Sequence, residues 1–311
     1  MNNQYKILVT PKEACDVLRN SKNLDICSEC QFIFSDGRIE NQKELNRELK
    51  KVDAVILDLE KINFETLDGV HHLKVISRFG VGHDNIDKEV LKNIGIPLTI
   101  TYGVASDAVA RHALALILTS MHNILFHTQN ARENIWDRKK NISFNKSKIG
   151  LIGHGQISQT LAWHLKNLGV DYTVYSRSQK TTLSAIINEC QILSVHLPKN
   201  NQTSNLFNKA IFQKMNQHII INTSRGGIVN EEDLLIALDN KQVYSYATDV
   251  FQNEPYSGIS SELCKHPQVI CTPHLASFDQ KTTIDMSFKA LENTLCLLKG
   301  KNLSSNYKIL T

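Results

Sequence analysis

The sequence lacks an apolar run long enough to cross a membrane. Its most apolar stretch, residues 113–126, is interrupted by Thr119, Ser120, His122 and Asn123, whereas a membrane-spanning helix needs about 20 predominantly apolar residues. The N-terminus lacks the apolar segment of a secretory signal peptide. We therefore expect a buried or interface helix at this stretch, no membrane partner and a cytoplasmic location.

The chain also lacks a large excess of positive or negative charge. The chain has 35 Lys and Arg residues against 31 Asp and Glu residues, which gives a formal net charge of +4. No basic run is interleaved with aromatic residues in the way that is typical of a nucleic-acid surface. A nucleic-acid partner is therefore not expected.

Paired cysteines are missing as well. The seven cysteines are scattered and odd in number, which argues against a disulfide scaffold and for a reducing compartment. Cys27 and Cys30 form one CxxC without a second pair, and His71 and His72 have no carboxylate or cysteine at ligand spacing, so we expect no metal site. With 41% hydrophobic and 21% charged residues among 311, the composition is that of a soluble globular protein with two domains.

Residues 148–177 contain the most informative pattern that is present. They read as an apolar strand, a glycine-rich turn, an amphipathic helix and a second strand, which is typical of a dinucleotide-binding βαβ unit. Gly153 allows the sharp bend out of the strand, and Gly155 lacks the Cβ that would keep a pyrophosphate from the backbone N–H groups at Gln156 and Ile157. The pattern predicts a bound nicotinamide or flavin nucleotide. The alternative is a glycine turn that joins two packed elements and binds nothing.

The residue after the second strand indicates which nucleotide is bound. An NAD site places Asp or Glu about 20 residues past the glycine turn, where its carboxylate accepts hydrogen bonds from the ribose hydroxyls. This chain has Ser176 and Arg177 there, with Lys180 close behind. Because a hydroxyl and a guanidinium can both bind a 2′-phosphate, the sequence favours NADP(H), with NAD(H) as the alternative cofactor. The competing interpretation is that Ser176 and Arg177 belong to a solvated surface loop.

Strand-like and helix-like segments alternate through the chain. We expect an α/β unit near the N-terminus, a six-stranded parallel sheet within residues 148–272 and one long helix at residues 106–130. The last helix, residues 282–298, has no strand partner in the second unit and is expected to pack on the first. The predicted fold class is α/β, with two doubly wound parallel-sheet domains and a cleft between them. A Rossmann NAD(P)-binding domain is expected at residues 102–280. It is inserted into a flavodoxin-like substrate domain, which is expected at residues 1–101 and 281–311.

Ionisable side chains follow three strand-like segments of the second unit. Arg225 comes after the first of these strands, Asp249 and Glu254 after the next, and His274 after the last. Ligands of open α/β sheets bind at the carboxyl ends of the strands, so we expect these side chains to converge. Each of them alone also has an ordinary structural explanation, as a surface arginine, a loop carboxylate or a structural histidine.

Six segments carry a resemblance to a known family: ISRFGVGHDNID, IGLIGHGQISQTLA, SVHLPKNNQT, INTSRGGIVNEEDLLIAL, TDVFQNEP and TPHLAS. In this order and at these spacings they resemble the D-isomer-specific 2-hydroxyacid dehydrogenases, close to the phosphoglycerate dehydrogenase branch. The likeness covers about residues 50–290. It implies an NAD(P)-dependent oxidoreductase that interconverts a small 2-oxo acid and a D-2-hydroxy acid by hydride transfer.

The resemblance implies that Arg225, Glu254 and His274 are the catalytic residues. The planar donor fork of Arg225 can anchor the substrate carboxylate and polarise the keto oxygen. His274 would donate the proton as the hydride arrives, and would act as the base in the oxidation direction. Glu254, hydrogen-bonded to the imidazole, would orient the ring and keep it charged at neutral pH.

The resemblance also assigns binding residues in both units. Asp249 resembles the residue that positions the nicotinamide carboxamide, with Thr223 and the backbone at His196 and Pro198 nearby. In the first unit, the turn Gly80-Val81-Gly82 resembles the loop whose N–H groups take the substrate carboxylate.

Several features of the chain leave alternatives open. Arg78 and His83 flank the glycine turn and could bind a second anionic group of the substrate, or they could be solvated charges. Arg111 stands where the family usually has glutamate, in the long helix through which we expect a homodimer. Formate dehydrogenases of this family carry glutamine where Glu254 stands, and this difference argues against them. We expect an NADPH-preferring reductase; the alternative is a non-catalytic nucleotide-sensing protein on the same fold, similar to transcriptional corepressors, which only turnover would distinguish.

Overall fold

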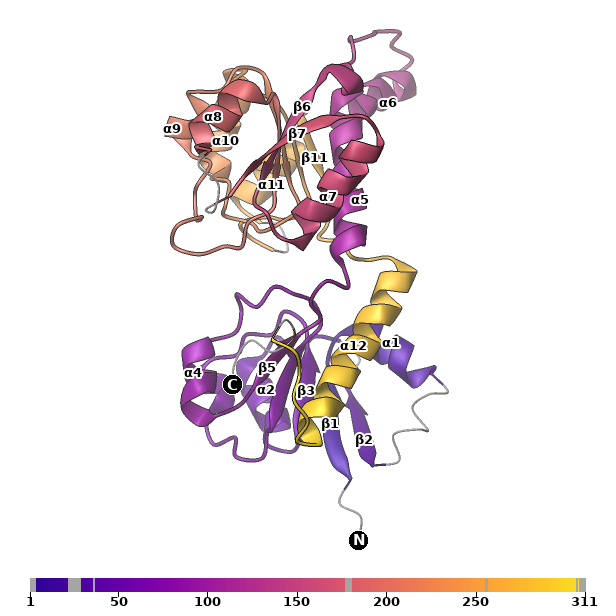
Figure 1. Ribbon diagram of the computed structural model, residues 1–311, viewed down its shortest axis with the longest axis vertical. Helices are drawn as coiled ribbons and strands as arrows, with labels where there is room; N and C mark the ends of the chain where they lie inside the picture. The colour runs from indigo at the N-terminus through magenta and orange to yellow at the C-terminus, as the bar shows by residue number, and fades with distance from the viewer. Residues whose placement is uncertain are drawn as a thin grey trace. The chain divides into compact units, whose positions relative to one another are not determined.

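The computed structural model describes residues 4–21, 29–35, 37–176, 181–254, 257–305 and 307. The chain divides into two compact units: unit 1 comprises Met1–Ala105 and Phe278–Thr311, and unit 2 comprises Ser106–Ser277 (Figure 1). Three residues singled out from the sequence, Cys27, Arg177 and Lys180, lie outside the described residues.

Unit 1 is built on a five-stranded parallel sheet in the order β2-β1-β3-β4-β5. This is the order of flavodoxin-like domains. The strands are β1 (Tyr5–Val9), β2 (Cys30–Phe34), β3 (Ala54–Leu57), β4 (Val75–Arg78) and β5 (Leu98–Ile100). The helices are α1 (Lys12–Arg19), α2 (Gln42–Leu49), α3 (Phe64–Leu67), α4 (Lys88–Ile94) and α12 (Gln280–Leu298).

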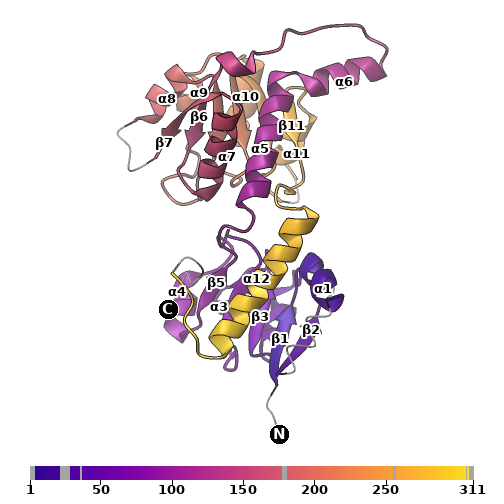
Figure 2. The same cartoon turned by 45° about the vertical axis from the view of Figure 1, so that its right-hand side comes forward.

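Successive residues of β4 face opposite sides of the unit 1 sheet. Ile76 belongs to an apolar cluster with Leu45 of α2 and Leu91 of α4. The hydroxyl of Ser77 instead donates to the backbone carbonyl of Ala290 in α12 at 3.1 Å. The helix α12 therefore covers the face opposite α2 and α4, and it crosses in front of the sheet in Figure 2. The prediction that the last helix packs on the first unit is confirmed.

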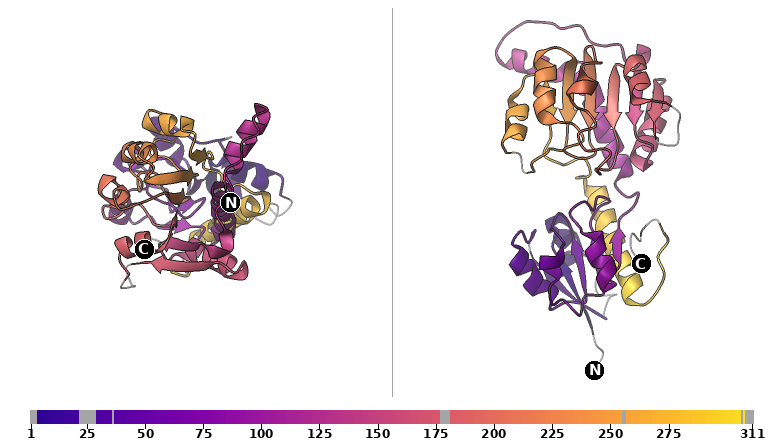
Figure 3. Two further views of the ribbon diagram at one scale, coloured as in Figure 1. Left: turned by 90° about the horizontal axis from the view of Figure 1, so that it is seen from above. Right: turned by 90° about the vertical axis from the view of Figure 1, so that its left-hand side faces the viewer.

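Unit 2 contains a six-stranded parallel sheet in the order β11-β10-β9-β8-β6-β7. The strands are β6 (Lys148–Ile152), β7 (Asp171–Tyr175), β8 (Ile192–Val195), β9 (His218–Asn222), β10 (Val243–Thr248) and β11 (Val269–Cys271). The helices are α5 (Ser106–Met121), α6 (Ile124–Arg132), α7 (Gln156–Asn167), α8 (Leu183–Glu189), α9 (Lys209–Phe212), α10 (Glu231–Asp239) and α11 (Ile259–Lys265), with a 3-10 turn at Phe144–Lys146. Helices α5 and α7 cover one face of the sheet and α8 to α11 cover the other (Figure 3). The two doubly wound parallel sheets confirm the predicted fold class.

The long helix expected at residues 106–130 is two helices. Helix α5 ends at Met121 and α6 begins at Ile124, and the two are bent by 60°. Asn123 between them has a φ of +49°, a left-handed conformation that an α-helix cannot continue through, and its side chain accepts a hydrogen bond from the Tyr244 hydroxyl at 2.5 Å. The prediction of a single helix was therefore wrong. Among the described residues no single helix is long and apolar enough to cross a membrane, and the bent pair α5 and α6 reaches that threshold only jointly, by length and composition.

Candidate active site

The carboxyl ends of β6 and β8 meet where the strand order of unit 2 reverses. In α/β sheets such a reversal opens a crevice that binds ligands. Gly153, directly after β6, has a φ of +121°, and a Cβ at this position would lie 2.2 Å from the carbonyl oxygen of His196, which follows β8. Only glycine permits this close crossing of two backbone segments.

Helix α7 begins at the end of the same turn. Its N-cap residue is Gly155, which has no side chain to accept hydrogen bonds from the first helical turn. A Cβ on Gly155 would meet no atom within 4 Å, so the space beside it is open. The start of α7, at Gln156 and Ile157, therefore has the features of an anion-binding helix N-terminus.

Two buried side chains at the ends of β8 and β9 present polar atoms that have no hydrogen-bond partner among the described residues. These atoms are His196 Nδ1 and Thr223 Oγ1. Buried polar atoms are normally paired, so a bound group that brings hydrogen-bonding atoms would satisfy both. Burial lowers the pKa of His196 to about 4, so its ring is neutral, and its Nε2 lies 2.9 Å from Ser194 Oγ. The residues present thus fit a nucleotide cofactor.

The remaining predicted cofactor positions lie on strand ends of the same sheet. Ser176 directly follows β7, the neighbour of β6. Pro198 comes two residues after His196 on the loop that leaves β8, and its carbonyl oxygen accepts a hydrogen bond from Thr203 Oγ1 at 2.6 Å. The sequence places these residues, together with Gly153 and Thr223, at the edge where the crevice lies.

The loop after β9 carries Arg225 and is fixed by its neighbours. The side chain of Asn222 accepts from the backbone N–H of Ser224 at 3.1 Å and donates to the carbonyl oxygen of Arg225 at 3.1 Å. A Cβ on Gly226 would lie 1.7 Å from the carbonyl oxygen of Phe251, in the loop after β10. The two loops are therefore in a contact that no side chain at position 226 could allow, and this contact fixes the backbone beside Arg225.

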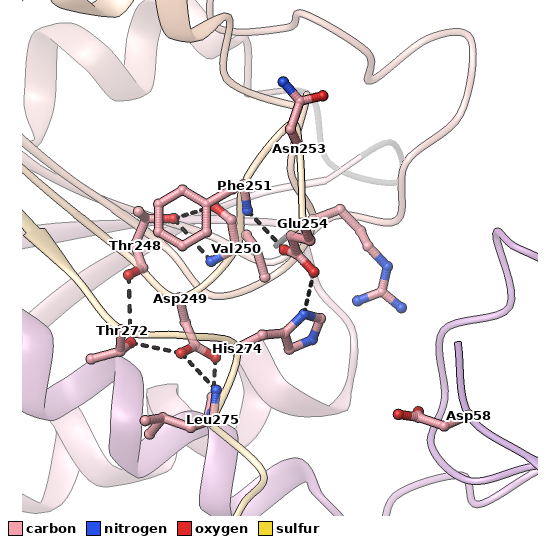
Figure 4. Close-up of polar contacts among 12 residues, drawn as sticks. Asp58, Thr248, Asp249, Val250, Phe251, Asn253, Glu254, Thr272, His274 and Leu275 are labelled. Carbon is pink, nitrogen blue, oxygen red and sulfur yellow. Dashed lines mark hydrogen bonds and ion pairs between the residues drawn. The ribbon is translucent and has the colours of Figure 1, made fainter. Parts of the chain in front are cut away.

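Glu254 and His274, from the loops after β10 and β11, form an ion pair (Figure 4). Glu254 Oε2 lies 2.7 Å from His274 Nδ1, and Glu254 Oε1 accepts the backbone N–H of Phe251 at 2.8 Å. The hydrogen bond with Glu254 has the largest effect on the pKa of His274 and raises it; burial acts in the opposite direction, and the charge of the Glu254 carboxylate adds to the rise. Burial by itself would raise the pKa of Glu254, but the hydrogen bond and charge of His274 outweigh it and lower that pKa. Arg225 lies close enough to act on both pKa values.

Asp249 holds the loop that carries His274 (Figure 4). His274 has a φ of +52°, which is rare for a residue other than glycine. The Asp249 carboxylate, 1% exposed, accepts hydrogen bonds from Thr272 Oγ1 at 2.6 Å and from the backbone N–H groups of Leu275 and Ala276 at 2.9 and 2.8 Å. These bonds bracket His274 on both sides and stabilise its unusual backbone conformation. The predicted role of Asp249 at the nicotinamide carboxamide stays a prediction.

Two residues of this site were missed from the sequence. Glu231, 2% exposed in the first turn of α10, accepts from the backbone N–H of Gln252 at 2.7 Å and from Ser260 Oγ at 2.6 Å, so it braces the loop that carries Glu254. His112 Nε2 of α5 lies 3.0 Å from Thr272 Oγ1. An acidic residue in the first turn of a helix usually serves the helix itself, so the sequence held no signal for the tertiary role of Glu231.

The predicted substrate residues lie in unit 1. Arg78 is the last residue of β4, and Val81 and Gly82 belong to the turn that follows it. The side chain of Arg78 is 8% exposed, and its Nη1 lies 2.5 Å from Asp58 Oδ1, so it forms a salt bridge at the end of β3. His83 Nδ1 lies 3.1 Å from the carbonyl oxygen of Val81. Among the described residues no group of three or more His, Cys, Asp or Glu side chains is placed to hold a metal ion.

Comparison with known proteins places the chain in a family. The model of the D-isomer specific 2-hydroxyacid dehydrogenase, NAD binding domain, matches residues 114–276. The chain is 32% identical to a glyoxylate reductase of Thermofilum pendens, over 84% of this chain and 83% of that protein. It is 29% identical to a D-3-phosphoglycerate dehydrogenase of Archaeoglobus fulgidus, over 84% of this chain and 52% of that protein, so it spans about half the length of that relative.

A solved structure supports the same fold. The D-lactate dehydrogenase of Aquifex aeolicus, complexed with NAD and lactic acid, superposes with a TM-score of 0.87 at 21% identity, over 98% of this chain and 99% of that chain. The protein belongs to the D-isomer-specific 2-hydroxyacid dehydrogenase family. It is an oxidoreductase that acts between 2-oxo and 2-hydroxy acids with a nicotinamide cofactor.

Proposed function

We propose that the protein reduces a small 2-oxo acid to the D-2-hydroxy acid, with Arg225, Glu254 and His274 as its catalytic residues. The observation that carries this proposal is the His274–Glu254 pair, 2.7 Å apart with the pKa of His274 raised. A group with a raised pKa at the carboxyl ends of the sheet is suited to donate a proton near neutral pH.

Each of the three side chains has a step in the reaction. Arg225 binds the substrate carboxylate through its donor fork and draws electron density toward the keto oxygen. The bound nicotinamide supplies the hydride. His274 gives its Nε2 proton to the keto oxygen as that oxygen gains negative charge, and the electron pair of the broken N–H bond stays on the ring. Glu254 accepts the Nδ1–H hydrogen bond throughout, so the ring keeps its orientation and tautomer.

We further propose that the cofactor is NADPH in preference to NADH. The support is the absence of a carboxylate at Ser176, the first residue after β7, because a carboxylate there would repel a 2′-phosphate and accept from the ribose of NAD. Arg177, the predicted phosphate ligand, follows Ser176 in the sequence but lies outside the described residues.

We also propose that two copies of the chain associate. The support is a set of apolar side chains left open to solvent on and after α6. That helix has no buried residue, Ile124 is 49% exposed, and Ile135 and Trp136 are 48% and 90% exposed. Sedimentation velocity on the wild type and on Trp136→Glu tests the proposal: a dimer that dissociates in the variant supports it, and a wild-type monomer contradicts it.

The function itself is tested by following NADPH and NADH oxidation with a panel of 2-oxo acids that includes glyoxylate, hydroxypyruvate and branched-chain acids. Turnover that is lost in His274→Ala supports the proposal. Nucleotide binding without turnover on any of these acids would overturn it and favour the nucleotide-sensing alternative.

A further inference from the structure

Arg78 ends β4 with its charge buried against the turn that follows. A Cβ on Gly80 would lie 3.1 Å from Arg78 Nη1, and the guanidinium also donates to the carbonyl oxygen of Phe79. The same Nη1 lies 2.5 Å from Asp58 Oδ1. The positive charge therefore lies behind the Gly80-Val81-Gly82 turn and is already compensated by a carboxylate.

Asp58 follows β3 at the same edge of the sheet, and its side chain is 36% exposed. Its backbone N–H donates to Glu60 Oε2 at 2.8 Å. Glu60 is 1% exposed, and its carbonyl oxygen accepts from Asn85 Nδ2 at 2.5 Å. Asp58 is thus held at this edge by a buried carboxylate and by the segment after the glycine turn, independently of its bond to Arg78.

Thr101, the residue after β5, lies at the same carboxyl edge of the unit 1 sheet. The backbone N–H of Thr101 donates to the carbonyl oxygen of Gly80 at 3.0 Å, and Thr101 Oγ1 is buried without a hydrogen-bond partner among the described residues. The carboxyl edge of unit 1 therefore offers a glycine turn, a hydroxyl and the partly exposed negative charge of Asp58, while the guanidinium of Arg78 is almost fully buried.

We propose that Asp58 is a specificity-determining residue that excludes 2-oxo acids with a second negative charge. The substrates it admits carry a neutral or hydrogen-bond-donating group beyond the keto carbon, as glyoxylate and hydroxypyruvate do. The inference rests on the proposed function, the reduction of a 2-oxo acid, and on the family resemblance, which assigns the Gly80-Val81-Gly82 turn to the substrate carboxylate alongside Arg225.

The physical reason is that a group of the substrate meets the exposed carboxylate of Asp58 before it can reach the buried guanidinium of Arg78. A phosphate or second carboxylate at this edge meets the exposed carboxylate of Asp58, while the guanidinium is 8% exposed and already bonded to that carboxylate. Like charges repel more strongly near a protein surface than in water, because the effective dielectric constant is lower. A hydroxyl group can instead donate a hydrogen bond to Asp58. Arg78 is therefore a partner of Asp58 and is not available as the second-anion anchor considered from the sequence.

The direct test is Asp58→Asn, which keeps the size of the side chain and removes its charge. The quantity to measure is kcat/KM for 3-phosphohydroxypyruvate divided by kcat/KM for hydroxypyruvate, in the wild type and the variant, at one low ionic strength because salt screens exposed charges. We expect this ratio to be below one in the wild type and to rise at least about tenfold in Asp58→Asn. Asp58→Glu retains the charge and should keep the ratio close to that of the wild type.

A matched control lies at the opposite edge of the same two strands. Asp53 precedes β3 and pairs with Lys74, which precedes β4, at 2.9 Å. Asp53→Asn makes the same change in net charge at the amino ends of the strands and should leave the ratio unchanged. A wild type that prefers the phosphorylated substrate, or an Asp58→Asn ratio equal to the wild-type ratio, overturns the inference.

Failure of the proposed function gives a different result. In that case the wild type reduces no 2-oxo acid at all, and calorimetric titration with 3-phosphoglycerate and with D-glycerate tests Asp58 without turnover. Tighter binding of 3-phosphoglycerate to Asp58→Asn than to the wild type supports the inference, and equal binding overturns it.

Discussion

Glu254 Oε2 lies 2.7 Å from His274 Nδ1, and the two residues belong to loops that follow adjacent strands, β10 and β11. The contact occupies Nδ1 of the ring, so the proton transfer that we propose would use Nε2. It also raises the pKa of His274 and lowers the pKa of Glu254, so both partners are charged over a wider pH range than either would be alone.

Replacement of His274 by alanine should abolish the proton transfer and leave cofactor binding intact. We expect kcat to fall by about 10² to 10⁴, the usual contribution of a general acid, with an unchanged Kd for the nucleotide. His164→Ala is the control, because His164 also pairs with a carboxylate, Asp107 at 3.0 Å, but on helix α7. A His274→Ala variant that retains more than about a tenth of the wild-type kcat would remove His274 from the role of acid.

Glu254→Gln should move the pH dependence of both reaction directions to lower pH. In the proposed mechanism reduction requires protonated His274, so it should fail as pH rises through the raised pKa of the imidazole. Without the charged partner that pKa falls, so the alkaline limb of reduction shifts to lower pH. Oxidation requires the neutral ring, so its acidic limb shifts in the same direction. Profiles of kcat/KM against pH in both directions check this, and unchanged profiles would disprove the coupling.

Arg225→Lys should lower kcat/KM by at least about tenfold, because an ammonium cannot reproduce the two parallel hydrogen bonds of the guanidinium. We expect most of the loss in KM if Arg225 mainly anchors the carboxylate, and in kcat if it mainly polarises the keto oxygen. Steady-state kinetics on one 2-oxo acid separate the two. Native kinetics in the lysine variant would show that the substrate carboxylate binds elsewhere.

Ser176→Asp and Arg177→Ala should each shift the cofactor preference toward NADH. Two partly solvated contacts to a 2′-phosphate are worth about 1.5 to 3 kcal/mol, or roughly ten- to a hundredfold in favour of NADPH. Ser176→Asp should have the larger effect, since it adds repulsion as well as an acceptor for the ribose. The measurement is kcat/KM for NADPH and NADH at fixed low ionic strength. A wild type that uses NADH equally well would contradict the proposed preference.

Gly226→Ala should destabilise the fold, whereas Gly155→Ala should weaken nucleotide binding. A Cβ at position 226 would lie 1.7 Å from the carbonyl oxygen of Phe251, so we expect a loss of about 3 kcal/mol or more in the free energy of unfolding. At Gly155 a Cβ meets no atom within 4 Å and φ is −76°, so stability should change by less than about 0.5 kcal/mol, while the Kd for the nucleotide rises. Chemical denaturation and nucleotide titration of both variants test this. Equal stability of the two would contradict the contact at Gly226.

The sequence predicts the elements of unit 2 well because their signals are local. The β6-α7-β7 segment has an apolar strand, a glycine turn and a helical period in one continuous stretch, and the structure contains these elements in that order. The break between α5 and α6 could not be predicted in this way. It depends on the left-handed Asn123 and on its bond to Tyr244, which is 121 residues away in the chain.

The candidate site shows the same limit. That Arg225, Glu254 and His274 follow strands of one parallel sheet is visible from the strand patterns, and so is their position at one edge. That Asp249 bonds to the N–H groups of Leu275 and Ala276 is not, because the partner atoms are backbone groups more than 25 residues later in the chain. The pairing of Arg78 with Asp58 across two strands was likewise beyond the sequence, and it changes the interpretation of Arg78.

The bond between Glu254 and His274 also makes the folding of two loops depend on pH. A histidine whose pKa is raised by folding contributes stability that is complete below its ordinary pKa and is lost as pH rises through the raised value. A glutamate whose pKa is lowered contributes stability that is complete above its ordinary pKa and is lost as pH falls through the lowered value. The bond between the loops after β10 and β11 is therefore strongest from mildly acidic to neutral pH. It weakens at low pH because Glu254 gains a proton, and at high pH because His274 loses one. A rise in pH through the raised pKa of His274 therefore has two effects. It removes the proton that the proposed mechanism needs, and it weakens the bond that holds these two loops together.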